Sequence, residues 1–186
     1  MGKQYKSSAI TRQAICIALK QLMDQKPLEK ITISELMDTC GMRRQHFYYY
    51  FTDIYDLLRW MLEKGMDQML QEIRRQDGPE AGLRHFFMMA VSAMPYLRKT
   101  SESNYGAEIG QILREQGYRM FAQIVEEENL YQDCSRYELK LILRYHSLAI
   151  LGILQEWTEN DTENMDRIVH EVYLLLTGAV SPFPQQ

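Results

Sequence analysis

One segment, residues 32–51 (TISELMDTCGMRRQHFYYYF), constrains the fold of this chain most strongly, because it predicts two short helices joined by a tight turn. Thr32 is a favourable N-cap residue for the first helix. Gly41 can adopt the positive φ that ends a helix, and Met42 supplies the hydrophobic contact that usually follows such an ending. The apolar residues of the first helix recur at the spacing of one helical face: Ile33, Leu36, Met37 and Cys40. The chain is therefore expected to reverse sharply after residue 41.

The second helix of this segment is expected to have two different sides. Phe47, Tyr50 and Phe51 fall at positions i, i+3 and i+4, which predicts an inward-facing aromatic side. The same spacing stacks Arg44 with Tyr48, and Gln45 with Tyr49, on the outer side. Arginine and glutamine can bind base edges in the major groove of DNA, and tyrosine hydroxyls can donate to phosphate oxygens. Helix-turn-helix geometry also occurs in all-α proteins that bind no DNA, and tyrosine clusters often serve packing, so both interpretations stay open on these residues alone.

The segment resembles the recognition helix of the TetR family of bacterial one-component transcriptional regulators. That helix typically runs from glycine and a hydrophobic residue to Leu-Tyr-x-Tyr-Phe, and residues 41–51 follow this order with Phe47 in the leucine place. The resemblance is close over about residues 8–60 and one of architecture beyond. Ile54 is a departure, because many members carry a phosphate-binding lysine at this position. The resemblance implies that the following residues face double-stranded DNA: Thr32, Arg43, Arg44, Gln45, His46, Tyr48 and Tyr49.

Two shorter stretches, FTDIYDLLRW at 51–60 and GILQEW at 152–157, are similar to the branch of this family that includes the activator of dihydroxyacetone kinase operons. In that activator the signal comes from a companion protein that resembles the substrate-binding subunit of the kinase. The similarity implies a regulator switched either by a small-molecule effector or by such a kinase-subunit-like partner protein. Activation and repression both remain open.

Charge is distributed unevenly along the chain. Residues 1–60 carry nine Lys or Arg and six Asp or Glu, a net charge of +3, whereas residues 61–186 carry twelve and nineteen, a net charge of −7. The positive end coincides with the candidate DNA-reading helix, which is where electrostatic attraction to phosphate would act.

The cysteines, Cys16, Cys40 and Cys134, are widely spaced and predict small core residues in a reducing cytoplasm. Because no uncharged stretch approaches the roughly 20 residues needed to cross a bilayer, we expect a soluble cytoplasmic protein with no membrane partner.

The rest of the chain reads as helices, because apolar residues follow the helical period instead of alternating. We therefore predict an all-α fold: a three-helix DNA-binding domain at 1–52 and a helical effector-binding and dimerisation domain at 53–186. Asp53 is the expected cap of a long helix that ends at 76–79. The first seven residues are expected to form a frayed arm. The other expected helices cover about 8–25, 80–94 with an interruption at Pro95, 103–128, 135–157 and 162–177.

The helix at 135–157 is apolar on two sides, which predicts dimerisation. One side carries Leu139, Ile142, His146, Ala149, Ile153 and Trp157. A monomer buries only one side, so the second is expected to meet a twin in a four-helix bundle together with the last helix. The predicted dimer interface consists of Leu141, Tyr145, Leu148, Leu151, Ile168, Val172 and Leu175. A two-fold pair would place its reading helices about 34–36 Å apart, so the operator should be a near-palindrome. A monomeric bundle that encloses this helix is the alternative.

Candidate residues for an apolar effector cavity are aromatic side chains together with a thioether and one aliphatic residue: Trp60, Phe86, Met89, Tyr105, Ile109, Phe121 and Tyr145. The histidines are isolated, so no metal site or cofactor is expected. The sequence has no glycine-rich phosphate loop, nucleophile elbow or His-Glu-x-x-His motif, which argues against an enzyme. The main alternative to a DNA-binding regulator is a helical co-regulator or scaffold protein without DNA binding.

Overall fold

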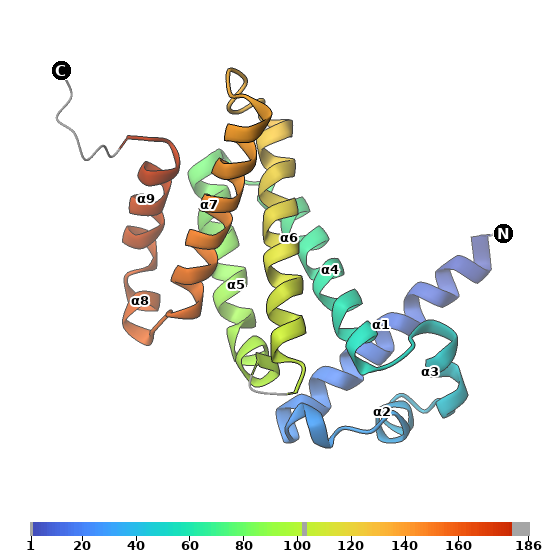
Figure 1. Cartoon of the computed structure of the whole chain (residues 1–186). Helices are drawn as coiled ribbons and strands as arrows, with labels where there is room; N and C mark the ends of the chain where they lie inside the picture. The colour runs from blue at the N-terminus through green and yellow to red at the C-terminus, as the bar shows by residue number, and fades with distance from the viewer. Residues whose placement is uncertain (1, 102–103, 180–186) are drawn as a thin grey trace, which may run out of the picture. The chain divides into compact units, whose positions relative to one another are not determined.

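The computed structural model describes residues 2–101 and 104–179, and within these ranges the chain forms helices and no strand (Figure 1). This confirms the predicted all-α fold class. The elements are α1 (Gly2–Gln25), the short 3₁₀ helix η1 (Leu28–Lys30), α2 (Ile33–Thr39), α3 (Arg44–Tyr50), α4 (Ile54–Ile73), α5 (Pro79–Ser101), α6 (Gly106–Glu127), α7 (Arg136–Gln155), α8 (Glu159–Glu163) and α9 (Met165–Leu176). None of the helices in these ranges is both long enough and apolar enough to span a membrane.

The described residues divide into two compact units. Unit 1 contains residues up to 64 together with the described part of 95–112, and unit 2 contains residues 65–94 and those from 113 onward. Helices α4, α5 and α6 each contribute one end to each unit. Unit 1 thus includes α1 to α3, the start of α4, and one end each of α5 and α6.

The helix-turn-helix forms as local capping chemistry predicts. Helix α1 packs against α2, and α2 packs against α3. The Thr32 hydroxyl accepts a hydrogen bond of 3.2 Å from the Glu35 amide, which caps α2. Gly41 has φ +65°, and its amide donates to the Asp38 carbonyl while the Met42 amide donates to the Met37 carbonyl, each at 2.9 Å. These two bonds complete a Schellman ending, which confirms the expected reversal.

Three helix boundaries differ from the sequence expectation. Helix α1 begins at Gly2, because residues 3–25 contain no proline or glycine to interrupt it. Helix α5 continues through Pro95, which removes only one backbone donor, and Thr100 adds a 2.7 Å bond to the Tyr96 carbonyl in the following turn. The expected helix at 162–177 is instead two helices, since a capping box at Thr158 starts α8 early and the chain breaks at Asn164.

Unit 2 has a hydrophobic core built from α4, α5, α7 and α9 and the chain after α7. Its buried members are Met69, Phe86, Phe87, Ala90, Ile150, Leu154, Trp157, Val169 and Val172. The buried line on α7 is Leu143, Ser147, Ile150 and Leu154, so the expected inward stripe was wrong in register except at its end, where Ile153 packs against the core and Trp157 is buried. Ser147 is polar and obscures this line in the sequence. Its hydroxyl is nevertheless satisfied by a 3.2 Å bond to the Arg144 carbonyl.

Burial keeps two cysteines in the thiol form. Burial raises the pKa of Cys16 to about 12 and also raises the pKa of Cys40 above its usual value. The Cys40 thiol lies 3.7 Å from the Ala14 carbonyl. Both residues lie in unit 1, where they serve as packing groups, as the sequence pattern indicates.

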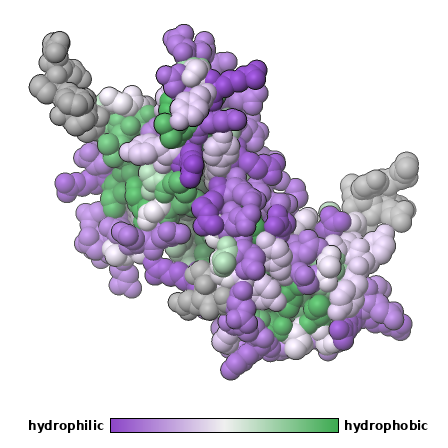
Figure 2. All heavy atoms as spheres, viewed as in Figure 1, coloured by the Kyte–Doolittle hydropathy of each residue, from purple (hydrophilic) through white to green (hydrophobic). Residues whose placement is uncertain are grey.

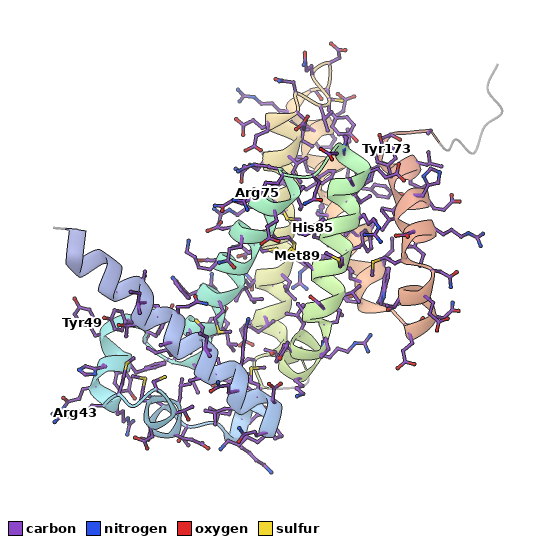
Figure 3. All side chains as sticks on the ribbon, turned by 180° about the vertical axis from the view of Figure 1, so that it is seen from behind. Arg43, Tyr49, Arg75, His85, Met89 and Tyr173 are labelled. Atoms are coloured by element: carbon purple, nitrogen blue, oxygen red, sulfur yellow. The ribbon has the colours of Figure 1, made fainter. Side chains whose placement is uncertain are left out.

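The histidines of unit 2 each have a polar neighbour. The Nε2 atom of His85, labelled in Figure 3, lies 2.9 Å from Glu72, and the Nδ1 atom of His170 lies 2.8 Å from Glu80. His146 is half-buried between Phe121 and the Tyr131 hydroxyl, which is 3.4 Å from its Nε2 atom. Within the described ranges, no group of three or more His, Cys, Asp or Glu side chains is placed to hold a metal ion.

We expect His146 to make the folded chain sensitive to mild acid. Burial lowers the pKa of His146 below 6.5, so the unfolded chain takes up this proton more readily than the folded chain. The free energy of unfolding should therefore fall as pH drops below about 6.5. The melting temperature of His146→Gln should decline less between pH 6.5 and 5 than that of the wild type. His170→Gln, which changes an exposed histidine of α9, is the control, and equal declines in wild type and His146→Gln would contradict the assignment.

Candidate nucleic-acid interface

Helix α3 presents a polar surface to solvent. We call its side chains the reading face: Arg43, Arg44, Gln45, His46, Tyr48 and Tyr49, all of which are exposed. Tyr49 is the most exposed tyrosine of this set at 75%, and Tyr48 follows at 49%. Figure 3 shows Arg43 and Tyr49 extending outward from α3. Thr32, the remaining predicted DNA-facing residue, is also exposed, and its hydroxyl caps α2.

Arg44 and Tyr48 form the stacked pair that their i, i+4 spacing predicts. The Arg44 guanidinium lies 5.6 Å from the centre of the Tyr48 ring and donates a 2.9 Å hydrogen bond to its hydroxyl. An arginine has five N–H donors, so this bond uses only one of them. The pair therefore holds a bidentate donor group on the outer side of α3 at neutral pH.

An aromatic underside fixes α3 in unit 1. Phe47 and Phe51 are buried, and their ring centres are 5.7 Å apart. Phe51 in turn contacts the Trp60 ring of α4, with the ring centres 6.0 Å apart and the ring planes inclined at 66°. Tyr50 is half-buried and meets the exposed Tyr49 ring edge-on at 4.9 Å. The inward-facing aromatic side predicted from the sequence is confirmed for Phe47 and Phe51.

The surroundings of α3 explain where positive charge is available. Lys26 forms an ion pair with Glu35, with Nζ 2.5 Å from Oε2, so this lysine is engaged within unit 1. Ile54, the departure from the TetR-family pattern noted in the sequence, is only 8% exposed and belongs to the core. The start of α4 is fixed by reciprocal capping, since Asp53 accepts a 2.8 Å bond from the Asp56 amide and Asp56 accepts one of 3.0 Å from the Thr52 amide. The expected cap at Asp53 is confirmed.

The predicted effector-cavity residues are distributed between the units. Trp60, Tyr105 and Ile109 belong to unit 1, where Ile109 is fully buried and Tyr105 stacks on Tyr55 at 6.4 Å. Phe86 and Met89 pack in the core of unit 2, and Phe121 contacts His146. Tyr145 is 67% exposed on α7 and so does not line an interior. A surface hollow on α6 involves none of the predicted residues and is lined by Tyr118, Arg119, Ala122, Gln123, Glu126 and Glu127.

Helices α7 and α9 expose a set of large apolar side chains, which we call the apolar face: Tyr137, Leu141, Tyr145, Leu148 and Leu175. Figure 2 shows hydrophobic residues gathered over these two helices. Of the other predicted interface residues, Leu151 is half-buried near Gly117 of α6, and Ile168 packs against the core. Val172 is only 6% exposed, because it fills the core of unit 2, so its assignment to an exposed interface is corrected.

Arg12 of α1 is a further residue at the base of α3, and it was not singled out by the sequence pattern. Its guanidinium lies 5.6 Å from the Tyr50 ring centre and 5.9 Å from that of Trp60. In the sequence, Arg12 is only a basic residue within the helix at 8–25, and such a residue by itself indicates a solvent-exposed side of that helix. The contact depends on residues far apart in the sequence.

Comparison with solved structures identifies the fold as that of TetR-family transcriptional regulators, although no family model matches the chain. The TetR family repressor AlkX from a Dietzia strain superposes with a TM-score of 0.62 at 16% identity, covering 90% of this chain and 98% of that one. FadR from Thermus thermophilus, a TetR-family repressor solved in complex with lauroyl-CoA, superposes with a TM-score of 0.53 at 18% identity, covering 94% of this chain and all of that one.

The chain is also similar to the dihydroxyacetone kinase operon activator DhaS. A solved DhaS structure superposes with a TM-score of 0.68 at 21% identity, covering 95% of this chain and 99% of that one. DhaS from Lactococcus lactis subsp. lactis, described as an HTH-type transcriptional activator of the dhaKLM operon, is 36% identical over 67 residues. The matched segment spans 36% of each chain, about a third of the length of that relative. These proteins are described as transcriptional activators and repressors.

Proposed function

We propose that this chain is a sequence-specific DNA-binding transcriptional regulator that binds the major groove through α3. The observation that carries this proposal is the pairing of an exposed reading face with a buried aromatic underside on the second helix of a helix-turn-helix. The similarity to DhaS and to TetR-family repressors supports it. In this proposal residues 1–52 bind DNA, and residues 53–186 receive the signal and dimerise.

The residue types of the reading face divide the work of recognition. Arg44 is suited to the N7 and O6 atoms of guanine, and Gln45 or His46 to purine edges. Tyr49, with Thr32 and Arg43, is suited to phosphate oxygens, which fix the register without reading sequence. Ile54 is buried and uncharged, so it cannot attract phosphate as a lysine at this position would. In this proposal the basic residues of α3 supply that attraction instead.

We further propose that the protein acts as a homodimer through the apolar face. Its α7 members recur at i, i+4, i+8 and i+11, which places them along one stripe of the helix. A stripe of this kind exposed to water favours association with a second copy, and two-fold symmetry then brings two reading faces to a near-palindromic operator.

The dimer proposal predicts an effect of shortening Leu141, which is 59% exposed. In Leu141→Ala each interface loses two copies of the side chain, or about 1 kcal/mol per copy. The dissociation constant of the dimer should rise roughly 30-fold, measured by light scattering after size exclusion over a dilution series. Leu130→Ala removes an equally large exposed side chain from outside α7 and α9 and should leave association unchanged. A wild-type chain that is monomeric at micromolar concentration would refute the proposal.

The signal received by the second domain is proposed to be a small molecule or a kinase-subunit-like partner protein. The lauroyl-CoA complex of Thermus FadR supports the first possibility, and the similarity to DhaS supports the second. Either would act in the cytoplasm through binding, with no cofactor and without catalysis by this chain.

The function is tested by selecting duplexes from a random DNA library with the purified full-length chain. We expect enrichment of a near-palindromic sequence, whose affinity falls steeply between 50 and 200 mM salt because several phosphate contacts release counterions. Equal and weak binding to every duplex would instead favour the alternative, a helical co-regulator or scaffold without DNA binding. Size exclusion of the mixture separates a dimer on DNA from a free dimer.

A further inference from the structure

The guanidinium of Arg12 occupies a junction of three helices in unit 1. It lies 5.6 Å from the centre of the Tyr50 ring on α3 and 5.9 Å from that of Trp60 on α4, while its backbone belongs to α1. A guanidinium within about 6 Å of an aromatic ring is attracted by the ring quadrupole. Arg12 thus links α3 and α4 through a single charged group.

Arg12 is not explained as an ordinary stabilising ion pair. Its Nε atom is buried, and no described residue offers it a hydrogen-bond partner. A buried N–H without a partner lowers the stability of the fold, and a partly desolvated charge adds to that cost. Methionine, with a stem of similar length, would fill this place without either penalty. A buried donor without a partner, at a place that methionine could fill, points to a role for Arg12 beyond stabilising the fold.

Two series of ring contacts lead from this junction to the reading face. In one, Arg12 contacts Tyr50, which meets the exposed Tyr49 edge-on at 4.9 Å. In the other, the Trp60 ring contacts Phe51 at 6.0 Å, Phe51 contacts Phe47 at 5.7 Å, and Phe47 contacts Tyr48 at 5.7 Å. Through these contacts, Tyr48 and Tyr49 are connected to Trp60 and Arg12 by packed aromatic rings.

We propose that Arg12 is a positioning residue for DNA binding, whose guanidinium, held between Tyr50 and Trp60, sets the orientation of α3 and thereby of Tyr49 and Tyr48. This role rests on the proposed DNA-binding function. Arg12 itself makes no contact with DNA in this proposal. Arg12 lowers the folding stability slightly and holds the reading face in a fixed orientation.

The test compares Arg12→Met with a matched variant, Arg59→Met, in the full-length chain. Arg59 makes the same kind of contact in the same unit, with its guanidinium 5.4 Å from the Tyr55 ring centre and a 2.9 Å bond to the Tyr55 hydroxyl. Tyr55 stacks on Tyr105 and is not among the ring contacts that reach Tyr48 or Tyr49. The probe is the duplex enriched by the wild-type chain, titrated over a series of salt concentrations.

We expect Arg12→Met to lower affinity for the selected duplex about tenfold, while the slope of log affinity against log salt stays at its wild-type value. A residue that contacts phosphate would reduce this slope by roughly one per subunit, or about two in a symmetric dimer. The melting temperature should be unchanged or higher, because the unpartnered donor is removed. Arg12→Lys, which keeps the charge and loses the planar group, should recover only part of the affinity, and Arg59→Met should bind as the wild type does.

Three results would overturn the proposal: wild-type affinity in Arg12→Met, a reduced salt slope, or a loss of affinity matched by a loss of melting temperature. If the wild type selects no duplex, the proposed DNA-binding function is refuted, and the role of Arg12 in orienting α3 is then tested by hydrogen exchange. In that case Arg12→Met should still speed exchange of the α3 amides relative to those of α9, and unchanged exchange in α3 would refute the positioning role of Arg12.

Discussion

Replacing Gly41 with valine is expected to destabilise the helix-turn-helix and to abolish DNA binding at working concentrations. Gly41 holds φ +65°, a conformation that a β-branched residue strongly disfavours. A Cβ atom at this position would meet nothing within 4 Å, so the cost arises from the backbone and not from crowding. Leaving the left-handed region would break the bonds from the Gly41 and Met42 amides that end α2. We expect a loss of about 2–3 kcal/mol, or a fall of roughly 4–10 °C in melting temperature.

Gly41→Asn and Gly65→Ala are the matched controls for this prediction. Asparagine tolerates the left-handed region better than other residues with a Cβ, so Gly41→Asn should retain most of the stability. Gly65 lies within α4 with open space around it, and alanine there should be neutral or stabilising. The measurements are thermal unfolding followed by circular dichroism and titration with the selected duplex. Unchanged melting and unchanged binding in Gly41→Val would show that the turn is not held by Gly41.

The parts of the fold that were predictable from sequence are those decided by neighbouring residues. Thr32, Gly41 and Asp53 each act on backbone groups within a few positions, and the structure places all three as their capping chemistry indicates. The expected interruption at Pro95 is absent, because the statistics of proline concern an isolated helix, whereas α5 is held on either side of Pro95 by packing within the units.

The features of the fold that the sequence could not predict depend on residues far apart in the chain, or on which of two equally apolar sides of a helix is buried. Helix α7 is apolar around much of its circumference, so the pattern alone did not identify the buried line through Ser147. Val172 was assigned to a surface for the same reason, since α9 offers apolar residues on more than one side. The Arg12 junction joins α1 to α3 and α4, and no local spacing rule connects residues that are 38 and 48 positions apart.

Arg44→Ala and Tyr49→Ala are each expected to abolish binding to the selected duplex while the dimer stays folded. A bidentate arginine contact discriminates by about 1–3 kcal/mol, and a symmetric dimer loses it twice, so affinity should fall roughly 10²- to 10⁴-fold in Arg44→Ala. Tyr49 is 75% exposed, and its loss removes a phosphate donor from each subunit without opening a cavity in the core. Both variants should keep the wild-type melting temperature and elution volume.

Conservative variants separate the contributions of these two side chains. Arg44→Lys keeps the charge but not the planar pair of donors, so it should preserve the salt slope and lose discrimination between the selected duplex and one with a substituted guanine. Tyr49→Phe keeps the edge-on contact with Tyr50 and removes the hydroxyl, so it should weaken binding to all duplexes alike. Arg114→Ala, at an exposed position on α6 outside the reading face, controls for a general loss of positive charge. Wild-type affinity in both Arg44→Ala and Tyr49→Ala would mean that another surface of the chain meets DNA, because the exposed side of α3 would then contribute nothing to the complex.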